Sequence, residues 1–439
     1  MTTDSRISPE RLVALRVLRR VADGAYADRA FASEARKADL DPRARSAAMR
    51  LTYGAVQRRR TLDWLIDGAV ERPAAIEPDV REVLRLGVYE LVWSDRVPDA
   101  AAVDQTVRLA RTLHGVPRRR TARAGLVNAV LRRIADGGRA QLATLDGDPL
   151  RLGIRHSLPD WIVDGLVASL GSLAEGVMAA SNDPAESALR WNPLKGPRED
   201  VTGALPVEWH DDPDIPEAIV LDGPFGIEDS PLWADGRAMS QSRASMLPAR
   251  VLDPQPGERI LDLCAAPGAK STHLAALSNN AAEIVCVELY EARARALRAL
   301  GERMGARLDV RVGDGRTLPI DGDFDAVLVD PPCTGLGVLS ARPDARWRRR
   351  PEALEELLVL QRDLLGRALE LTRPGGRVVY STCTLLADEN EGAVAAVDAA
   401  ASDLTALYPR WAHPRLPGAL LTLPGRDGTD GFFVVRIDR

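Results

Sequence analysis

From about Asp253 onward, short apolar segments typical of strands alternate with longer segments of helical periodicity. The strand-like segments are 259–263, 283–289, 308–314, 324–330 and 377–382. Parallel strands need long crossover connections, and helices between them supply right-handed ones. The alternation therefore predicts a doubly wound, Rossmann-like α/β domain over 237–439, with the closing segment 431–438 as an added edge strand.

The first 140 residues follow a different pattern. Apolar residues recur there at helical spacing, as in Leu62, Leu65 and Ile66, and proline-containing breaks separate the helical segments. We therefore predict an all-helical domain over 1–140.

A Gly- and Asp-rich stretch at 135–149 is typical of a linker. Beyond it, a helical segment at 159–180 precedes short strand-like segments at 187–191 and 218–221. These elements predict a small α+β subdomain over 150–236.

Composition indicates a globular protein, with 45% apolar and 28% charged residues in a chain of 439. No apolar stretch approaches the length of a membrane span, and the start of the chain lacks a basic region followed by an apolar one. We therefore expect a cytoplasmic enzyme with no membrane partner.

The net charge of −5 conceals an asymmetry along the chain. Residues 1–140 contain 27 Lys and Arg against 18 Asp and Glu, a net charge of +9, whereas the remainder carries −14. A basic module on an acidic body is typical of polyanion binding, although arginine-rich helix faces can also be merely solvated. The basic clusters are Arg58-Arg59-Arg60, Arg118-Arg119-Arg120 and Arg132-Arg133.

A small-residue loop, DLCAAPGAKS at 262–271, joins the first strand of the alternating region to a helix. Such a loop lets backbone amides approach a ligand, and Glu288, about twenty residues later, could bind a ribose diol. The loop lacks GxGxxG and Walker A spacing, so an adenosyl ligand without a pyrophosphate, S-adenosylmethionine, suits it best. Asp314, at the end of the third strand, could meet the adenine. The alternative is an ordinary turn with solvated acids.

Four cysteines occur, Cys264, Cys286, Cys333 and Cys383, with no CxxC spacing. This disfavours a disulfide framework and a zinc site, so the thiols should be unpaired and no metal is expected. Cys286 is best explained as a packing residue. The Cys264 side chain is best explained in the same way, although the backbone of Cys264 could contact the cofactor.

Cys333 and Cys383 each follow a strand-like segment, where open α/β sheets bind their ligands. Cys333 stands in Asp-Pro-Pro-Cys, where amino-methylating enzymes carry an aromatic residue. Methylation of carbon 5 of a pyrimidine needs a thiolate that adds to carbon 6, and a second cysteine could assist release. Packing remains the alternative for either thiol alone.

Together these motifs closely resemble the Sun/RsmB (Fmu) family of ribosomal RNA cytosine-C5 methyltransferases, over essentially the whole chain. The helical part is similar to the NusB-like RNA-binding domain that precedes the catalytic part in this family, through the segments 50–66 and 125–134. The catalytic matches are DLCAAPGAK, VGDGR, DPPCTGLGVLSARPDARWRRR, YSTCTLLADENE and DGFFVVRI.

The resemblance implies that Cys383 is the nucleophile and that Cys333 assists product release; the residues alone leave this order open. Asp330 would serve both the cofactor and the target base. Two departures from the family pattern are Ser242, usually acidic, and Ala269, usually glycine. The implied contacts of S-adenosylmethionine are Cys264, Ala265, Ala266, Pro267, Gly268, Ala269, Lys270, Glu288, Asp314 and Asp330.

RNA is the expected partner, and its target cytosine must leave the base stack to reach the thiols. We expect no DNA partner and a monomeric enzyme. The arginines just beyond Cys333 could hold phosphates while Trp347 stacks on a base, or they could form a solvated loop. A tRNA methyltransferase and a non-catalytic RNA-binding assembly factor are the alternatives. The arginines concerned are Arg342, Arg346, Arg348, Arg349 and Arg350.

Overall fold

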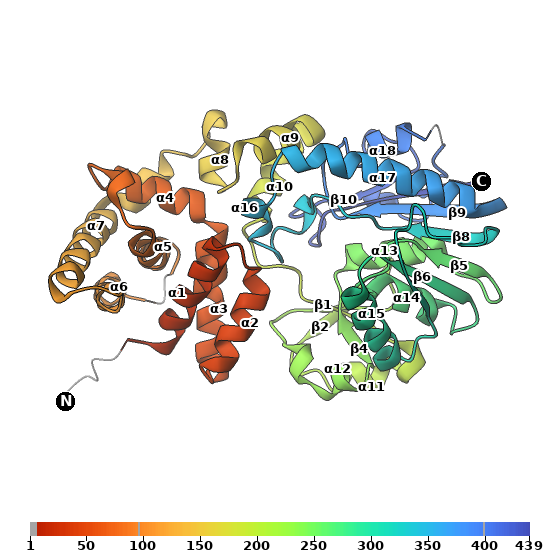
Figure 1. Ribbon diagram of the computed structural model, residues 1–439, viewed down its shortest axis with the longest axis horizontal. Coiled ribbons are helices and arrows are strands. Elements are labelled where there is room, and N and C mark those ends of the chain that lie inside the picture. Colours follow the sequence, from red (N-terminus) through yellow and green to blue (C-terminus); the bar gives the residue numbers. More distant parts are fainter. Residues whose placement is uncertain (1–6, 95–96, 398–399) are drawn as a thin grey trace. The chain divides into compact units, whose positions relative to one another are not determined.

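Helices α1 to α8 build the first of two units into which the chain divides in the computed structural model (Figure 1). The structure describes residues 7–94, 97–397 and 400–439. The first unit also takes in residues 181–183 and 342–349. Its helices are α1 Pro9–Ala22, α2 Ala27–Lys37, α3 Pro42–Gln57, α4 Arg59–Gly68, α5 Pro78–Trp93, α6 Asp99–Arg111, α7 Pro117–Ala143 and α8 Leu152–Arg155, together with most of α9 (Asp160–Leu170) and with α16 (Ala345–Arg348).

Local sequence explains where these helices begin. Proline occupies the first turn of α1, α3, α5 and α7, where its missing N–H is not needed. The Asp41 side chain accepts from the Ala44 amide and caps α3. Leu62, Leu65 and Ile66 are fully buried in one apolar core, which confirms the predicted all-helical character.

The predicted linker at 135–149 is wrong over its first part, because α7 continues to Ala143. Gly137 and Gly138, which lie in this part of α7, each disfavour a helix by about 1 kcal/mol relative to alanine. Tertiary contacts override this cost: Ile134 is buried in the helical core, and the Arg139 guanidinium donates to the Leu91 carbonyl at 2.6 Å. Glycine content alone therefore misplaced the end of the helix.

The predicted helix at 159–180 is broken in two. A 3-10 turn at Gly171–Leu173 separates α9 (Asp160–Leu170) from α10 (Ala174–Ala180), and Gly171 has a φ of +57°. The boundary between the units falls inside α9.

Contrary to expectation, the segment Asp160–Ala180 reaches the length and apolar content of a membrane span, with a mean hydropathy of 1.4. Core helices of soluble proteins share these properties, so one such segment is weak evidence for a membrane.

A small antiparallel sheet opens the second unit. Its order is β2-β3-β1-β4, formed by Trp209–Asp211, Ala218–Leu221, Ala188–Trp191 and Ala238–Ser240. The predicted strands at 187–191 and 218–221 are β1 and β3. The three-residue strands β2 and β4 were missed because they are too short to show a period.

The large sheet of the second unit has the order β10-β11-β9-β8-β5-β6-β7. Its first five strands in the chain are parallel, which confirms the doubly wound, Rossmann-like prediction. The closing strand β11 is not at the edge as predicted: it pairs antiparallel with β9 and with β10, which forms the edge. The strands are β5 Arg259–Asp262, β6 Glu283–Glu288, β7 Asp309–Val312, β8 Phe324–Val329, β9 Thr372–Thr382, β10 Leu420–Thr422 and β11 Phe432–Asp438.

Helices cover both faces of this sheet (Figure 1). Helix α17 packs on β8 and β9, while α13 packs on β8, β9 and β11, and α14 and α15 pack on β6. All five parallel strands end at the same edge, so the residues that follow them share one side of the domain. The helices named here are α13 Arg243–Leu252, α14 Ala269–Leu277, α15 Glu291–Met304 and α17 Glu352–Leu371; α11 is Arg198–Thr202, α12 Pro231–Ala234, α16 Ala345–Arg348 and α18 Glu391–Ala395.

Candidate active site

The two cysteines singled out by the sequence meet at the carboxyl ends of neighbouring strands. Cys333 follows β8 and Cys383 follows β9, and these strands pair in parallel, with a register shift near the start of β8. Their Sγ atoms lie 3.3 Å apart. Cys333 is buried, whereas Cys383 is partly exposed. Among the described residues, which include all four cysteines, no disulfide forms.

The surroundings of Cys333 favour the neutral thiol. Its hydrogen bond with Cys383 and its burial raise the pKa of Cys333 well above the ordinary thiol range, and the charges of Glu389 and Asp330 act in the same direction. A group of this kind is a proton donor at neutral pH rather than a thiolate.

Asp330, which follows β8, is held by two side chains. Lys270 donates to its Oδ2 at 2.6 Å, and the Ser381 hydroxyl donates to its Oδ1 at 3.1 Å. Burial opposes the charge of Lys270, but Asp330 and the neighbouring Cys383 together raise the Lys270 pKa. An ammonium therefore lies within electrostatic range of the Cys383 sulfur.

The small-residue loop forms a tight connection between β5 and α14. The Ala265 amide donates to the Val287 carbonyl at 3.0 Å, and the Ala266 carbonyl accepts from Arg293 at 2.7 Å. Pro267 is exposed. Gly268 has a φ of +109°, and a Cβ there would lie 2.4 Å from the Leu297 side chain, so glycine is required on two counts.

The two departures from the family pattern cause no strain. Ala269 is the first residue of α14, a conformation that alanine adopts readily. Ser242 precedes α13 in an extended conformation. Its neighbour Gln241 accepts a hydrogen bond from the buried Arg190 at 2.8 Å.

Cys264 lies in the loop, but its thiol is not activated. Burial and the carboxylates around it raise the pKa of Cys264 well above the ordinary range. Its amide points to Asp262 Oδ1 at 3.4 Å. This leaves the backbone of Cys264 as the part that could meet a ligand.

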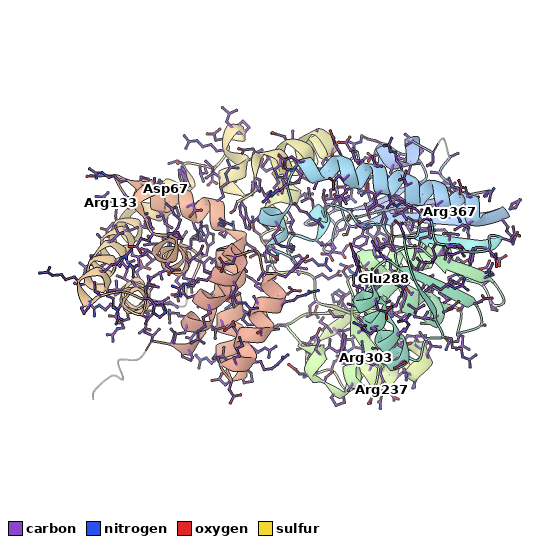
Figure 2. The ribbon with its side chains drawn as sticks, viewed as in Figure 1. Asp67, Arg133, Arg237, Glu288, Arg303 and Arg367 are labelled. Atoms are coloured by element: carbon purple, nitrogen blue, oxygen red, sulfur yellow. The ribbon has the colours of Figure 1, made fainter. Side chains whose placement is uncertain are left out.

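Glu288, labelled in Figure 2, ends β6 with a buried carboxylate whose Oε1 accepts from the Tyr290 amide at 3.0 Å. Asp314 follows β7, and its hydrogen bonds from Arg316 lower its pKa. Beside Glu288, Leu289 and Tyr290 expose about half of their surface, at 50% and 59%.

These residues fit an adenosyl cofactor. The Glu288 carboxylate suits a ribose diol, and the Asp330 carboxylate suits an ammonium group. The exposed side chains of Leu289 and Tyr290 suit an adenine ring. Asp314 lies at the end of the next strand.

The arginine-rich segment at 342–350 was predicted to lie beside the thiols and to bind RNA, but part of it packs elsewhere. Residues 342–349 belong to the helical unit, where Arg346 is fully buried. Its guanidinium donates to the Gln57, Ser157 and Ser181 carbonyls and to Asn182 Oδ1. Trp347 is also engaged, because its indole N–H donates to the Val56 carbonyl at 2.7 Å. The prediction that Arg346 binds RNA is therefore wrong, whereas stacking of a base on the partly exposed Trp347 stays a prediction.

The basic clusters differ from one another. Arg58 and Arg59 stack on the rings of Trp93 and Trp347, and Arg60 donates to Leu158 and Asp160, so the first cluster is used within its own unit. In the cluster at 118–120 all three residues are exposed. The second cluster therefore remains the better polyanion candidate.

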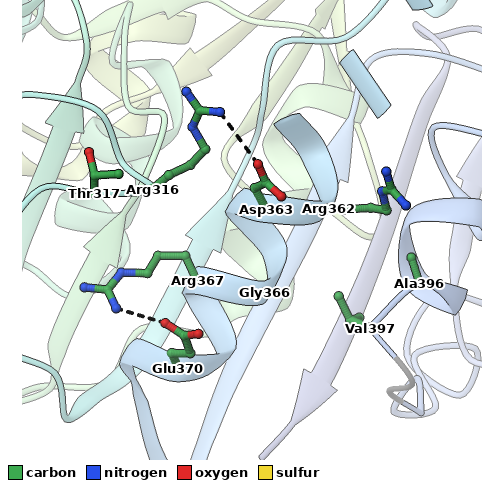
Figure 3. Close-up of a pocket in the computed structure, with 9 residues that line it drawn as sticks. All are labelled: Arg316, Thr317, Arg362, Asp363, Gly366, Arg367, Glu370, Ala396 and Val397. Carbon is green, nitrogen blue, oxygen red and sulfur yellow. Dashed lines mark hydrogen bonds and ion pairs between the residues drawn. The ribbon is translucent and has the colours of Figure 1, made fainter. Parts of the chain in front are cut away.

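A shallow hollow of about 770 Å³ lies beside α17 (Figure 3). Its lining includes Arg316, Arg362 and Arg367, of which Arg316 pairs with Asp363 and Arg367 with Glu370. None of the predicted site residues lines it. The hollow is thus separate from the cysteine pair.

Five residues that support the cysteines were not predicted: Ser381, Thr334, Thr384, Glu389 and Gln361. The first four lie inside the quoted motifs around Cys333 and Cys383, whereas Gln361 lies in α17. Their position next to the cysteines in the sequence could have indicated a supporting role for the residues inside the motifs. The contacts that join the two motifs, however, are visible only in the folded structure.

Comparison with known proteins places the parts of the chain in families. Residues 249–438 match the family "16S rRNA methyltransferase RsmB/F", residues 8–136 match the NusB family, and residues 158–228 match the ferredoxin-like domain of RsmF/B-like methyltransferases.

Relatives match over nearly the whole length. A probable ribosomal RNA small subunit methyltransferase B of Synechocystis is 34% identical, covering 94% of this chain and 95% of its own. The ribosomal RNA small subunit methyltransferase B of Thermus thermophilus is 34% identical, with 99% and 98% covered. The crystal structure of a protein named PH0851 superimposes with a TM-score of 0.82 at 26% identity, covering 99% of each chain.

Proposed function

Since the chain belongs to the RsmB/F family of 16S rRNA methyltransferases, we propose that it transfers a methyl group from S-adenosylmethionine to carbon 5 of a cytosine in small-subunit ribosomal RNA. The observation that carries the proposal is the pair of thiols, 3.3 Å apart, at the carboxyl ends of β8 and β9. Methylation at an exocyclic nitrogen needs no thiol, whereas polar methylation at carbon 5 of a pyrimidine needs one that adds to carbon 6.

In the proposed reaction, Cys383 first gives its proton to water, Sγ then bonds to carbon 6, and the electron pair displaced from the ring makes carbon 5 nucleophilic. Carbon 5 then takes the methyl group, and the electron pair of the broken carbon–sulfur bond stays on the donor sulfur. The proton on carbon 5 leaves to water, the ring double bond re-forms, and the bond between carbon 6 and Cys383 breaks with its electron pair returning to sulfur. Cys333, at 3.3 Å, donates a hydrogen bond to that departing sulfur.

When bound, the cofactor supplies an electrophilic sulfonium methyl group. We assign its binding to the loop 264–270 with Glu288, Asp314 and Asp330. The Lys270 ammonium holds the Asp330 carboxylate, which would serve both the cofactor and the target base. Gly268 keeps the loop close to α15, where a larger residue would meet Leu297.

We assign RNA binding to the helical domain at 1–140, with the small subdomain at 150–236 and the catalytic domain at 237–439. The exposed arginines at 118–120 supply positive charge for phosphates. The cytosine must leave its stack to reach Cys383. We further propose a monomeric cytoplasmic enzyme, as expected for modification of ribosomal RNA.

The test is methyl transfer in vitro and in the cell. Purified protein, protein-free 16S rRNA and methyl-labelled S-adenosylmethionine should give label in 5-methylcytosine after nucleoside digestion. Bisulfite sequencing of RNA from a deletion strain should show one or more lost 5-methylcytosines in small-subunit rRNA. Label in another nucleoside, loss of a methyl group only from tRNA, or no loss at all would overturn the proposal.

A further inference from the structure

A buried carboxylate, Glu389, lies between the segments that carry the two cysteines, and the reaction above gives it no role. Its side chain is completely buried, at 0% exposure. Burying a carboxylate costs several kcal/mol unless hydrogen bonds compensate. A carboxylate retained at this place therefore needs an explanation.

Both oxygens of Glu389 are bound by groups that hold the Cys333 loop. Oε1 accepts from the backbone amide of Thr334, the residue after Cys333, at 2.8 Å and from Gln361 Nε2 at 2.9 Å. Oε2 accepts from the Thr334 hydroxyl. Gln361 also donates to the carbonyl of Pro332, the residue before Cys333, at 2.9 Å. Cys333 is thus tethered on both sides.

The same network reaches the Cys383 segment. The hydroxyls of Thr334 and Thr384 lie 2.6 Å apart. The Thr334 hydroxyl has one proton and donates it to Glu389 Oε2, so the Thr384 hydroxyl must donate to Thr334. The bonds run in one direction, from beside Cys383, through the residue after Cys333, to Glu389.

The charges around the two thiols are opposite in sign. Glu389 and Asp330 add to the hydrogen bond and the burial that raise the pKa of Cys333. Lys270, by contrast, lies within electrostatic range of Cys383, and despite burial its pKa is raised chiefly by Asp330 and further by negative charge on Cys383. The buried negative charge thus lies on the side of the thiol that must keep its proton.

We propose, resting on the function proposed above, that Glu389 is a positioning residue that holds Cys333 beside Cys383 as a proton donor for release of the methylated RNA. Glu389 touches neither substrate nor cofactor in this role and acts through Cys333. Its loss should slow release while leaving attack and methyl transfer largely intact.

The test separates adduct formation from release. Glu389→Gln keeps the size of the side chain and one acceptor oxygen but removes the charge. Single-turnover reactions with 16S rRNA, quenched on denaturing gels, should show an adduct that forms at a rate similar to wild type. The adduct should persist at least about tenfold longer, because general acid catalysis contributes roughly 10²- to 10⁴-fold.

Asp388→Asn is the matched control, since it removes an adjacent carboxylate whose side chain is exposed. It should leave both rates unchanged. Thr334→Val, which removes one hydroxyl contact to Glu389, should lengthen the life of the adduct less than Glu389→Gln does. Affinity for S-adenosylhomocysteine, measured by calorimetry, should be unchanged in all three variants.

A double variant decides whether Glu389 acts through Cys333. If it does, Glu389→Gln adds no further delay in a Cys333→Ala background. Additive delays, or normal release by Glu389→Gln, would overturn the inference while leaving the proposed function intact. A wild-type enzyme that yields no 5-methylcytosine would instead refute the proposed function itself.

Discussion

Cys333 and Cys383 lie 3.3 Å apart, yet the chain holds them in different ways. Cys383 directly follows β9, a strand paired on both sides, with β8 and β11. Cys333 lies in an irregular segment after β8 and depends on side-chain tethers to Glu389 and Gln361. A central strand positions the residue at its end through its ladder, whereas a loop residue needs contacts of its own.

The largest effect should come from removing each of the two sulfurs in turn. Cys383→Ala should abolish methylation and form no covalent RNA adduct, because the nucleophile is gone. In the Cys333→Ala variant, Cys383 should still attack the cytosine, and the resulting covalent protein–RNA adduct should persist through denaturing gels. The measurement is gel shift with labelled RNA; an adduct with the first variant and none with the second would reverse the two roles.

The second prediction concerns the backbone link between the two regions. The Gly337 amide donates to the Cys383 carbonyl at 2.9 Å, and a Cβ on Gly337 would lie 2.0 Å from the Gly431 carbonyl oxygen. Gly337→Ala should therefore lower the free energy of unfolding by about 1–3 kcal/mol, the range for overpacking, and impair methylation.

Gly366→Ala is the control for this substitution. Gly366 lies inside α17, and a Cβ added to it would meet no atom within 4 Å. Alanine should stabilise the helix there by up to about 1 kcal/mol. Urea unfolding of both variants provides the measurement, and equal effects would show that the close approach at Gly337 is unimportant.

A third prediction uses pH to compare the thiols. The raised pKa of Cys333 means that its neutral form persists to higher pH, so its thiolate fraction is smaller than that of an ordinary thiol at the same pH. Alkylation of Cys333 by iodoacetamide at about pH 7.5, below the ordinary thiol pKa of about 8.5, should be at least about tenfold slower than in the denatured chain, since at such a pH each unit of pKa changes the thiolate fraction about tenfold.

Cys383→Ala removes the hydrogen-bond partner and should lower the pKa of Cys333, so that alkylation at the same pH becomes faster. Mass spectrometry of the Cys333 peptide measures both rates. Fast, pH-dependent labelling of Cys333 in the wild-type protein would contradict the assignment of a protonated thiol.

The smallest effect is expected at a thiol outside the pair. Cys286 lies in β6, is fully buried, and packs in the core of the sheet. Cys286→Ala should cost about 1 kcal/mol of unfolding free energy and leave methylation unchanged below the melting temperature. Loss of methylation without loss of stability would mean that burial alone does not explain this cysteine.

Much of the fold could be predicted because periodicity reports burial directly. The five parallel strands and the helical first unit follow from apolar spacing. Strands β2 and β4 have three residues each and left no period to detect. The order of strands is a further step: the sequence pattern predicted β11 at the edge, whereas it pairs between β9 and β10.

Arg346 is a residue whose burial could not be predicted from its charge. A run of arginines suggests an exposed, phosphate-binding loop, yet this guanidinium is buried among oxygens from Gln57, Ser157 and the segment 181–182. Those acceptors come from three distant parts of the chain. No local pattern could have shown that together they offset the cost of burying the charge.

The sequence by itself determined the class of chemistry, because the types of side chain and their places at strand ends follow from local order. Tertiary structure alone decided which groups surround each thiol. The Cys333 and Cys383 motifs lie 50 residues apart, and only the pairing of β8 with β9 brings their sulfurs together and encloses Glu389 beside one of them. Protonation depends on such through-space neighbours and on burial, and neither is encoded in local sequence.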